Sequence, residues 1–160
     1  MGDTADAVAN PVALRRARIG DAAELARLSA QLGYPQSADA FERRLRRLLI
    51  SADHPVIVAT GDGAAQDDTH LLGFVAIERR LMLETGDRVE IVGLVVDDAA
   101  RRRGIGQALV AAALDWARGI GIGEVIVRSN VAREQSHPFY EDAGFERIKS
   151  QHVYLRRVGA

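Results

Sequence analysis

The stretch Val89-Glu-Ile-Val-Gly-Leu-Val-Val-Asp97 precedes the turn Arg101-Arg-Arg-Gly-Ile-Gly106, and an Ala/Leu-rich segment follows. The β-branched run predicts a strand, and the Ala/Leu-rich segment predicts an amphipathic helix over residues 104–118. The turn between them would present backbone N–H groups and arginines at the positive end of that helix. This succession is typical of a pyrophosphate-binding site.

Two common phosphate-binding motifs do not fit this turn. The dinucleotide-binding motif G-x-G-x-x-G requires a third glycine where this chain has Leu109. The P-loop requires Gly-Lys-Ser/Thr, and the only lysine is Lys149. What remains is R-x-x-G-x-G from Arg101 to Gly106, which fits a phosphate-binding turn or a plain tight turn between strand and helix.

Outside this stretch, the apolar pattern predicts further strands and helices. The expected strands cover residues 12–19, 55–60, 71–83, 89–96, 124–129 and 152–157. Further helices should follow the N-cap candidates Asp21 and Ser37, and a short one should hold Phe139 and Tyr140. A strand, a helix and a strand in succession from residue 89 predict a parallel crossover. We therefore expect an α+β fold around a mixed sheet.

Size and composition limit the class of protein. At 160 residues the chain is long enough for one domain with a sizeable core. A net charge of −1 argues against a nucleic-acid-binding protein, which usually has a basic excess. The absence of cysteine excludes disulfides, thiolate metal ligands and a cysteine nucleophile. The histidines show no metal-ligand spacing, so we expect no metal site.

The ends and the apolar runs of the chain bear on its location. Residues 1–10 are small and polar, so we expect a flexible tail before a single domain over residues 11–160. No apolar run approaches the roughly 18 residues that a membrane span requires. We therefore expect a cytoplasmic protein without a membrane or nucleic-acid partner.

The segment from Val89 to Tyr154 resembles the GNAT (Gcn5-related) N-acetyltransferase superfamily. Leu94-Val-Val-Asp97 followed by Arg101-x-x-Gly104-Ile-Gly106-x-x-Leu109 is similar to its acetyl-CoA motif, and Phe139-Tyr140-x-x-x-Gly144-Phe145 is similar to its closing motif. The N-terminal half matches in layout alone. The resemblance implies a mixed, mostly antiparallel sheet of about six or seven strands. It also implies a splayed central parallel pair and about four flanking helices.

The resemblance assigns a site for acetyl-CoA. The pantetheine arm would bind the backbone of Leu94, Val95 and Val96, and a β-bulge near Gly93 would splay this strand from its parallel neighbour. The pyrophosphate would bind the turn, with arginine side chains near the phosphates. The turn residues expected at the cofactor are Arg101, Arg102, Arg103, Gly104, Ile105, Gly106 and Gln107.

The closing motif departs from the common family pattern at one position. Many relatives carry an asparagine seven residues before the motif tyrosine, where this chain has Arg133, and Asn130 lies three residues earlier. Arg133 with His137-x-Phe-Tyr140 resembles a variant of the motif found in a subset of the superfamily that includes aminoglycoside-acetylating members. We expect Asn130 and Arg133 near the cofactor.

The chemistry of acetyl transfer points to candidate catalytic residues. An alkylamine has a pKa around 10, so about one molecule in a thousand is neutral near pH 7, and the enzyme needs a base. Glu90 lies six residues before Val96, the spacing of the catalytic glutamate in histone-type relatives, so the resemblance implies that it is the base. The alternative is a strand-edge carboxylate facing water. Tyr140 matches the family tyrosine that protonates the leaving thiolate. His137 is an alternative base or a structural residue, and direct attack on the thioester is expected in a chain without cysteine.

By family analogy, the acceptor groove lies between the first two helices and the central strands. The residues nominated for acceptor binding are Leu32, Tyr34, Glu78, Glu84 and His137. Carboxylates there would attract a cationic amine. The expected function is acetyl-CoA-dependent N-acetylation of a primary amine, on a small, aminoglycoside-like molecule or a peptide. The alternative is a non-catalytic CoA-binding sensor or partner domain, and a homodimer is one expectation because dimers are common in the superfamily.

Overall fold

The computed structural model describes residues 12–61 and 68–159, in two compact units, Met1–Val127 and Arg128–Ala160. The units are described separately below, and the single domain predicted for residues 11–160 stays a prediction. The predicted flexible tail, residues 1–10, lies outside the described residues. Within those residues, every helix is too short or too polar to span a bilayer.

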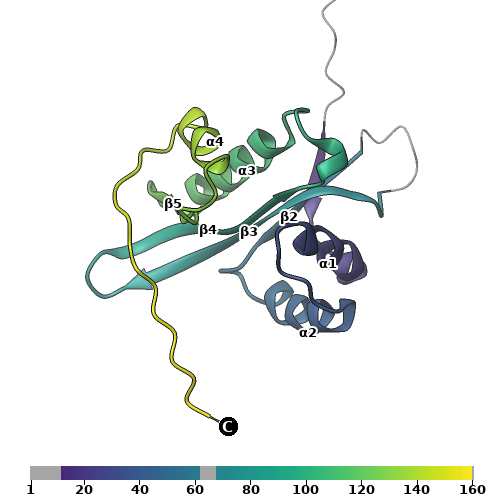
Figure 1. Ribbon diagram of the computed structural model, residues 1–160, viewed down its shortest axis with the longest axis horizontal. Coiled ribbons are helices and arrows are strands. Elements are labelled where there is room, and N and C mark those ends of the chain that lie inside the picture. Colours follow the sequence, from purple (N-terminus) through teal and green to yellow (C-terminus); the bar gives the residue numbers. More distant parts are fainter. Residues whose placement is uncertain (1–11, 62–67, 160) are drawn as a thin grey trace, which may run out of the picture. The chain divides into compact units, whose positions relative to one another are not determined.

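The first unit is built on a five-stranded sheet in the order β1-β2-β3-β4-β5 (Figure 1). The strands are β1 (Ala13–Arg16), β2 (Val56–Thr60), β3 (Leu71–Met82), β4 (Gly86–Val96) and β5 (Val125–Val127). The first three pairings are antiparallel, and β4 pairs with β5 in parallel. This confirms the mixed, mostly antiparallel sheet with a parallel pair, although the described residues form five strands where six or seven were expected.

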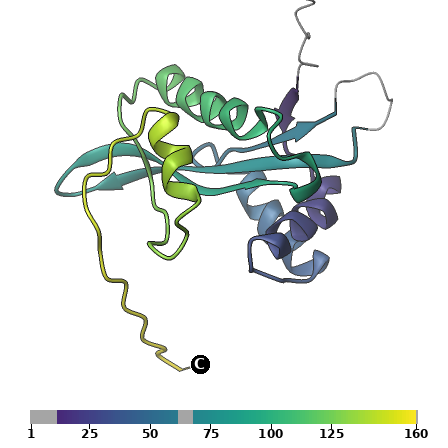
Figure 2. The ribbon, with the colours of Figure 1, turned by 45° about the horizontal axis from the view of Figure 1, so that its top comes forward.

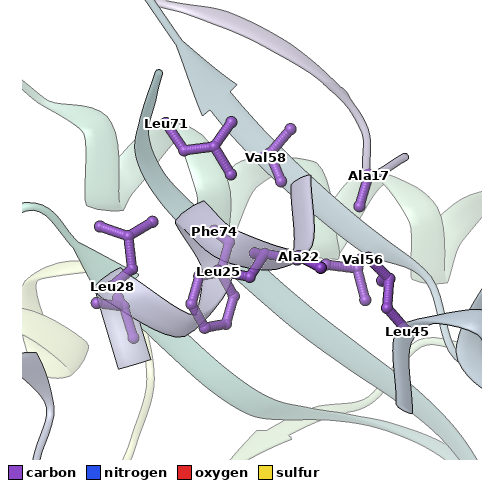
Figure 3. Close-up of a cluster of buried hydrophobic side chains, with 10 residues drawn as sticks. Ala17, Ala22, Leu25, Leu28, Leu45, Val56, Val58, Leu71 and Phe74 are labelled. Carbon is purple, nitrogen blue, oxygen red and sulfur yellow. The ribbon is translucent and has the colours of Figure 1, made fainter. Parts of the chain in front are cut away.

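Helices cover both faces of this sheet. Figure 2 shows α1 (Ala22–Gln31) and α2 (Ala38–Leu49) on one face and α3 (Ile105–Gly119) on the other. Because side chains alternate along a strand, each central strand contributes to two layers of core. The layer beneath α1 is shown in Figure 3, where Leu25 and Leu28 of the helix meet Phe74 of β3.

Gly73 fixes the approach of α3 to the opposite face. A Cβ atom on Gly73 would lie 2.6 Å from the carbonyl oxygen of Val95 and 3.2 Å from Cδ1 of Leu109. Only glycine fits at that separation, so the β3 backbone and α3 come into close contact where β4 ends. The start of α3 is thereby held at this end of the sheet.

Both predicted N-cap residues, Asp21 and Ser37, stand directly before their helices, but only one of them caps its helix through the side chain. Ser37 caps α2, since its Oγ accepts a hydrogen bond from the Ala40 N–H at 3.1 Å. Asp21 precedes α1 but makes no side-chain cap to it. Its carboxylate accepts hydrogen bonds from the Arg18 N–H at 2.7 Å and from Arg15 at 2.7 and 2.9 Å. The 3-10 turn (Ile19–Asp21) and Arg15 of β1 thus use the oxygens that would have capped the helix.

The second unit holds α4 (Ser136–Asp142), which completes the four expected helices in the described residues. The chain turns at Gly144, where φ is +91°. The strand predicted over residues 152–157 does not form, and this accounts for part of the lower strand count. A strand needs a neighbour for its N–H and C=O groups, and none of the described ladders includes residues 145–159.

Candidate functional site

A β-bulge interrupts β4 where the cofactor strand was expected to splay. Ala76 of β3 pairs with Gly93, but the next residue, Ile77, pairs with Ile91, so Val92 is the extra residue. This agrees with the bulge predicted near Gly93. Gly93 itself has no positive φ and leaves room for a Cβ, since the nearest atom would lie at 3.5 Å. The bulge therefore does not depend on a glycine at that position.

Beyond the bulge, β4 is no longer paired with β5. In the described residues, β5 pairs with Val89, Glu90 and Ile91 alone. The following residues, Leu94–Val96, pair with β3 on one side, and β5 has already ended on the other. A strand edge of this kind can hydrogen-bond an extended ligand in the manner of an added strand.

The turn after β4 leads directly into the positive end of α3. A 3-10 turn, η2 (Asp98–Ala100), is followed by two residues in the left-handed region, Arg102 with φ of 63° and Gly104 with φ of 74°. Gly104 is the N-cap of α3, with no side-chain cap, and the first turn of the helix carries no acidic residue. The Ala108 N–H is the first to bond back, to the Gly104 carbonyl at 3.1 Å.

The geometry of this turn therefore suits an anion. The N–H groups of Ile105, Gly106 and Gln107 precede the first helical hydrogen bond, and the helix dipole adds about half a positive charge. Three exposed arginines precede them, of which Arg101 forms an ion pair with Asp98 at 2.6 Å. The donors and charges at this position fit a diphosphate group.

Glu90 lies on β4 just before the bulge and is buried, with 5% of its surface exposed. Its Oε2 accepts a hydrogen bond from Nη1 of Arg80 at 2.8 Å. Glu78 lies directly opposite Glu90 in the β3–β4 ladder, and its Oε1 is 3.7 Å from Nε of Arg80. The hydrogen bond from Arg80 to Glu90 raises the pKa of Arg80, so the guanidinium stays charged between the two carboxylates. Sequence reasoning missed Arg80, although it lies two residues after Glu78 and hence on the same face.

The structure places the acceptor candidates of the first unit at three locations. Leu32 follows α1 and packs against the core beneath that helix, and Tyr34 is exposed two residues later. Glu78 lies on the same face of the sheet as Phe74, because side chains four residues apart in a strand point the same way. Glu84 lies in the β3–β4 turn, six residues from Glu78 and beyond the end of β3 at Met82.

The second unit brings the closing-motif residues together. The Tyr140 ring packs edge-on against Phe139, with centroids 5.3 Å apart, and against Phe145 at 5.9 Å. Burial raises the pKa of Tyr140 above its usual value of 10.0, and the charge of Arg133 opposes this effect without cancelling it. Tyr140 is therefore a neutral hydroxyl at physiological pH, as a proton donor must be.

Asn130 and His137 form a local hydrogen-bonded turn in the same unit. Oδ1 of Asn130 accepts a hydrogen bond from the Ala132 N–H at 2.9 Å, and its carbonyl accepts one from the Arg133 N–H at 2.9 Å. Nε2 of His137 lies 3.2 Å from the same carbonyl. These contacts hold Asn130 in a turn and place the His137 ring against the backbone of that turn.

Comparison with known proteins identifies the class to which this fold and turn belong. The model of the Acetyltransferase (GNAT) family matches residues 22–145, most of the chain. The chain therefore belongs to this family, whose acetyl donor is acetyl-CoA.

The relatives are N-acetyltransferases with different acceptors. The chain is 36% identical over 112 residues to "Glucosamine 6-phosphate N-acetyltransferase 1" of Oryza sativa subsp. japonica, covering 69% of this chain and 65% of that protein. It is 31% identical over 153 residues to "Aminoglycoside N(6')-acetyltransferase type 1" of Stenotrophomonas maltophilia, covering 93% of this chain and 95% of that protein. The crystal structure of the aminoglycoside 6'-N-acetyltransferase AAC(6')-Ih from Acinetobacter baumannii has the same fold, with a TM-score of 0.79 at 18% identity, covering 93% and 100% of the two chains.

Proposed function

We propose that this chain is an N-acetyltransferase that transfers the acetyl group of acetyl-CoA to a primary amine. One observation carries the proposal. A strand edge that β5 leaves unpaired beyond Ile91 is followed by a turn that exposes the first N–H groups of α3. Acetyl-CoA has the same order of parts, since its extended pantetheine arm, which would lie along the strand edge, is followed by the diphosphate, which would lie at the turn.

Each end of the cofactor has its proposed residues. The backbone of Leu94–Val96 would hold the arm, and the N–H groups from Arg102 to Gln107 would hold the diphosphate. Arg101 and its two neighbours would supply positive charge at the phosphates. Asn130 and Arg133 remain predicted cofactor contacts in the second unit.

Two residues would carry the proton transfers. Bound acetyl-CoA would supply a thioester carbon for the amine to attack. Glu90 would accept the proton of the attacking amine, directly or through water, while Arg80 orients its carboxylate. Tyr140 would give its proton to the departing thiolate, and its raised pKa supports that role.

The acceptor is proposed to be the amine of a small molecule or a peptide. Aminosugars are favoured by the names of the rice and Stenotrophomonas relatives. Leu32, Tyr34 and Glu78 are the proposed acceptor contacts, because they lie at the end of α1 and on the sheet face that carries Glu90. Glu84 and His137 remain predictions.

A screen of amines tests this function. The purified chain is incubated with acetyl-CoA and with aminoglycosides, glucosamine 6-phosphate, polyamines and peptides, and free thiol and acetylated product are measured. We expect thiol release that depends on one class of amine, with a matching product one acetyl group heavier. Replacing acetyl-CoA by longer acyl-CoA donors in the same assay tests whether the acyl group is strictly acetyl.

A second candidate is a CoA-binding domain without catalysis. The ion pair between Arg80 and Glu90 favours it, because the candidate base is engaged by a permanent charge. Tight CoA binding without turnover on any amine would establish this alternative.

A homodimer and a cytoplasmic location complete the proposal. Support for a dimer comes from the second unit, where Val153, Tyr154 and Leu155 are 90%, 90% and 77% exposed in a segment with the composition of a strand. The cytoplasmic location stays a prediction from the sequence.

A further inference from the structure

A row of polar side chains on α1 reaches the point where β4 ends. Glu24, Arg27 and Gln31 follow the spacing i, i+3, i+7, which places them on one face of the helix. They lie beside the apolar stripe of Leu25 and Leu28, which packs on the sheet. These three polar residues are called the α1 bracket below.

The first half of the bracket fixes the start of β3. Oε1 of Glu24 accepts a hydrogen bond from the Leu71 N–H at 3.0 Å, and Nη2 of Arg27 donates to the Leu71 carbonyl at 2.9 Å. Arg27 also donates through Nε to Glu24 at 2.6 Å. The hydrogen bond from Arg27, followed by that from Leu71, lowers the pKa of Glu24, so the pair is charged at neutral pH.

The second half of the bracket holds the residues that follow β4. Nη1 of Arg27 donates to Oδ2 of Asp97 at 3.0 Å, and Nε2 of Gln31 donates to Oδ1 of Asp97 at 3.3 Å. Oε1 of Gln31 accepts a hydrogen bond from the Asp98 N–H at 3.0 Å. Gln31 thus binds the side chain of one residue and the backbone of the next.

Asp97 is the buried centre of this arrangement. It is 5% exposed, and its Oδ1 also accepts a hydrogen bond from the Ala99 N–H at 3.1 Å, which caps the N-terminal end of η2. Burial raises the pKa of Asp97, but the hydrogen bonds from Ala99, Gln31 and Arg27 outweigh burial and lower it. A buried carboxylate of this kind keeps one position because any other would leave its charge unpartnered.

We propose that the α1 bracket positions the turn that binds the diphosphate of acetyl-CoA, and that Gln31 is a positioning residue for the cofactor. This inference rests on the proposed function. Asp97 and Asp98 join β4 to η2, which leads into the turn, so their orientation sets the direction in which Arg101–Gln107 leaves the sheet. Gln31 is the last residue of α1, and Leu32, a proposed acceptor contact, follows it directly. The helix that positions the diphosphate turn therefore also leads into the proposed acceptor site.

A donor without a diphosphate separates positioning from general destabilisation. The test compares Gln31→Ala with wild type for acetyl-CoA and for S-acetylpantetheine, which keeps the thioester arm but lacks the nucleotide. We expect kcat/KM for acetyl-CoA to fall about tenfold, the order of one hydrogen bond to a charged group, and kcat/KM for S-acetylpantetheine to stay unchanged. The Kd of CoA, measured by calorimetry, should rise by the same factor.

Two further variants sharpen the comparison. Gln31→Glu keeps an acceptor for the Asp98 N–H but sets a carboxylate against Asp97, so its loss of CoA affinity should exceed that of Gln31→Ala. Gln36→Ala is the matched control, because Gln36 is an exposed glutamine that contacts Arg44 and lies outside the bracket.

Each remaining outcome overturns the inference. An unchanged CoA affinity in Gln31→Ala, or an equal loss for both donors, would show that the bracket does not position the diphosphate turn. In either case wild-type binding of CoA leaves the proposed function intact. Failure of wild type to bind CoA would overturn the proposed function together with the inference.

Discussion

Glu90 is a carboxylate buried within a sheet, and such a group is stable when a charged partner compensates it. Arg80 is that partner, from the neighbouring strand and on the same face. The spacing of Glu90 from the cofactor strand is visible in the sequence, whereas Arg80 is ten residues away and was not singled out. The pair is identified by strand register, which sequence does not fix.

Replacing Glu90 tests the base directly. We expect Glu90→Gln to lower kcat about a hundredfold, the order of general base catalysis, while the Kd of CoA stays unchanged. Glu124→Gln, at an exposed position just before β5, is the control and should keep wild-type kcat. A wild-type rate in Glu90→Gln would remove Glu90 from the mechanism and direct attention to His137.

Replacing Tyr140 tests the proposed general acid in the same way. Tyr140→Phe keeps the ring contacts with Phe139 and Phe145 but removes the hydroxyl, so kcat should fall about a hundredfold without loss of CoA affinity. Tyr154→Phe is the control, since Tyr154 is 90% exposed. Equal activity of the two variants would leave Tyr140 with a packing role alone.

Among the elements, the strand, turn and helix around the proposed cofactor site were predicted closely. The helix predicted over 104–118 is observed as Ile105–Gly119, because its stripe of apolar residues and its flanking glycines are local signals. The contact of Arg27 with Asp97 joins residues 70 apart in the sequence. No local pattern reports such a contact, so the bracket that holds the turn was not predicted.

The ion pair between Arg15 of β1 and Asp21 before α1 predicts how the free energy of unfolding depends on pH. Burial raises the pKa of Asp21, but the hydrogen bonds from Arg15 and the Arg18 N–H outweigh burial and lower it. The stability that Asp21 contributes is therefore complete above the pKa of an unfolded aspartate, about 3.9, and is lost as pH falls through its lower folded value.

We expect Asp21→Asn to lower the free energy of unfolding by about 2 kcal/mol at neutral pH, since it breaks charged hydrogen bonds. The difference from wild type should shrink as pH falls below about 3.9, the pKa of an unfolded aspartate, because protonation of Asp21 removes the same charge from wild type. Urea unfolding at neutral pH and at a series of acidic pH values measures this difference, with Asp39→Asn at an exposed position of α2 as the control. A difference that stays constant with pH would contradict this role of the Asp21 charge.

For the whole molecule, the family and the sheet layout were predictable, and the last strand was not. The apolar run Val153-Tyr-Leu155 after His152 predicts a strand, but a strand needs a neighbouring strand to pair with, and composition does not supply one. In the described residues this segment stays unpaired and exposed. A second copy of the chain is the neighbour that the proposed homodimer would provide.

Measuring the mass of the protein in solution tests the proposed homodimer. Light scattering should give twice the mass of one chain for wild type. The double variant Val153→Ser, Leu155→Ser should shift the mass toward a monomer, because it removes exposed apolar area. Ile50→Ser, at an 88% exposed position after α2, should remain dimeric. A monomeric wild type at all concentrations tested would contradict the dimer.

The central claim is that the turn between β4 and α3 binds the diphosphate of acetyl-CoA. Titration of the isotope-labelled chain with CoA, followed by backbone amide resonances, tests it most directly. The account predicts the largest shifts at Arg102–Gln107, with further shifts at Leu94–Val96. It also predicts their loss in Gly106→Glu, which sets a negative side chain at the phosphates, and their retention in Gly119→Glu at the other end of α3. Saturable CoA binding that leaves these amides unmoved, or no binding at all, would contradict it.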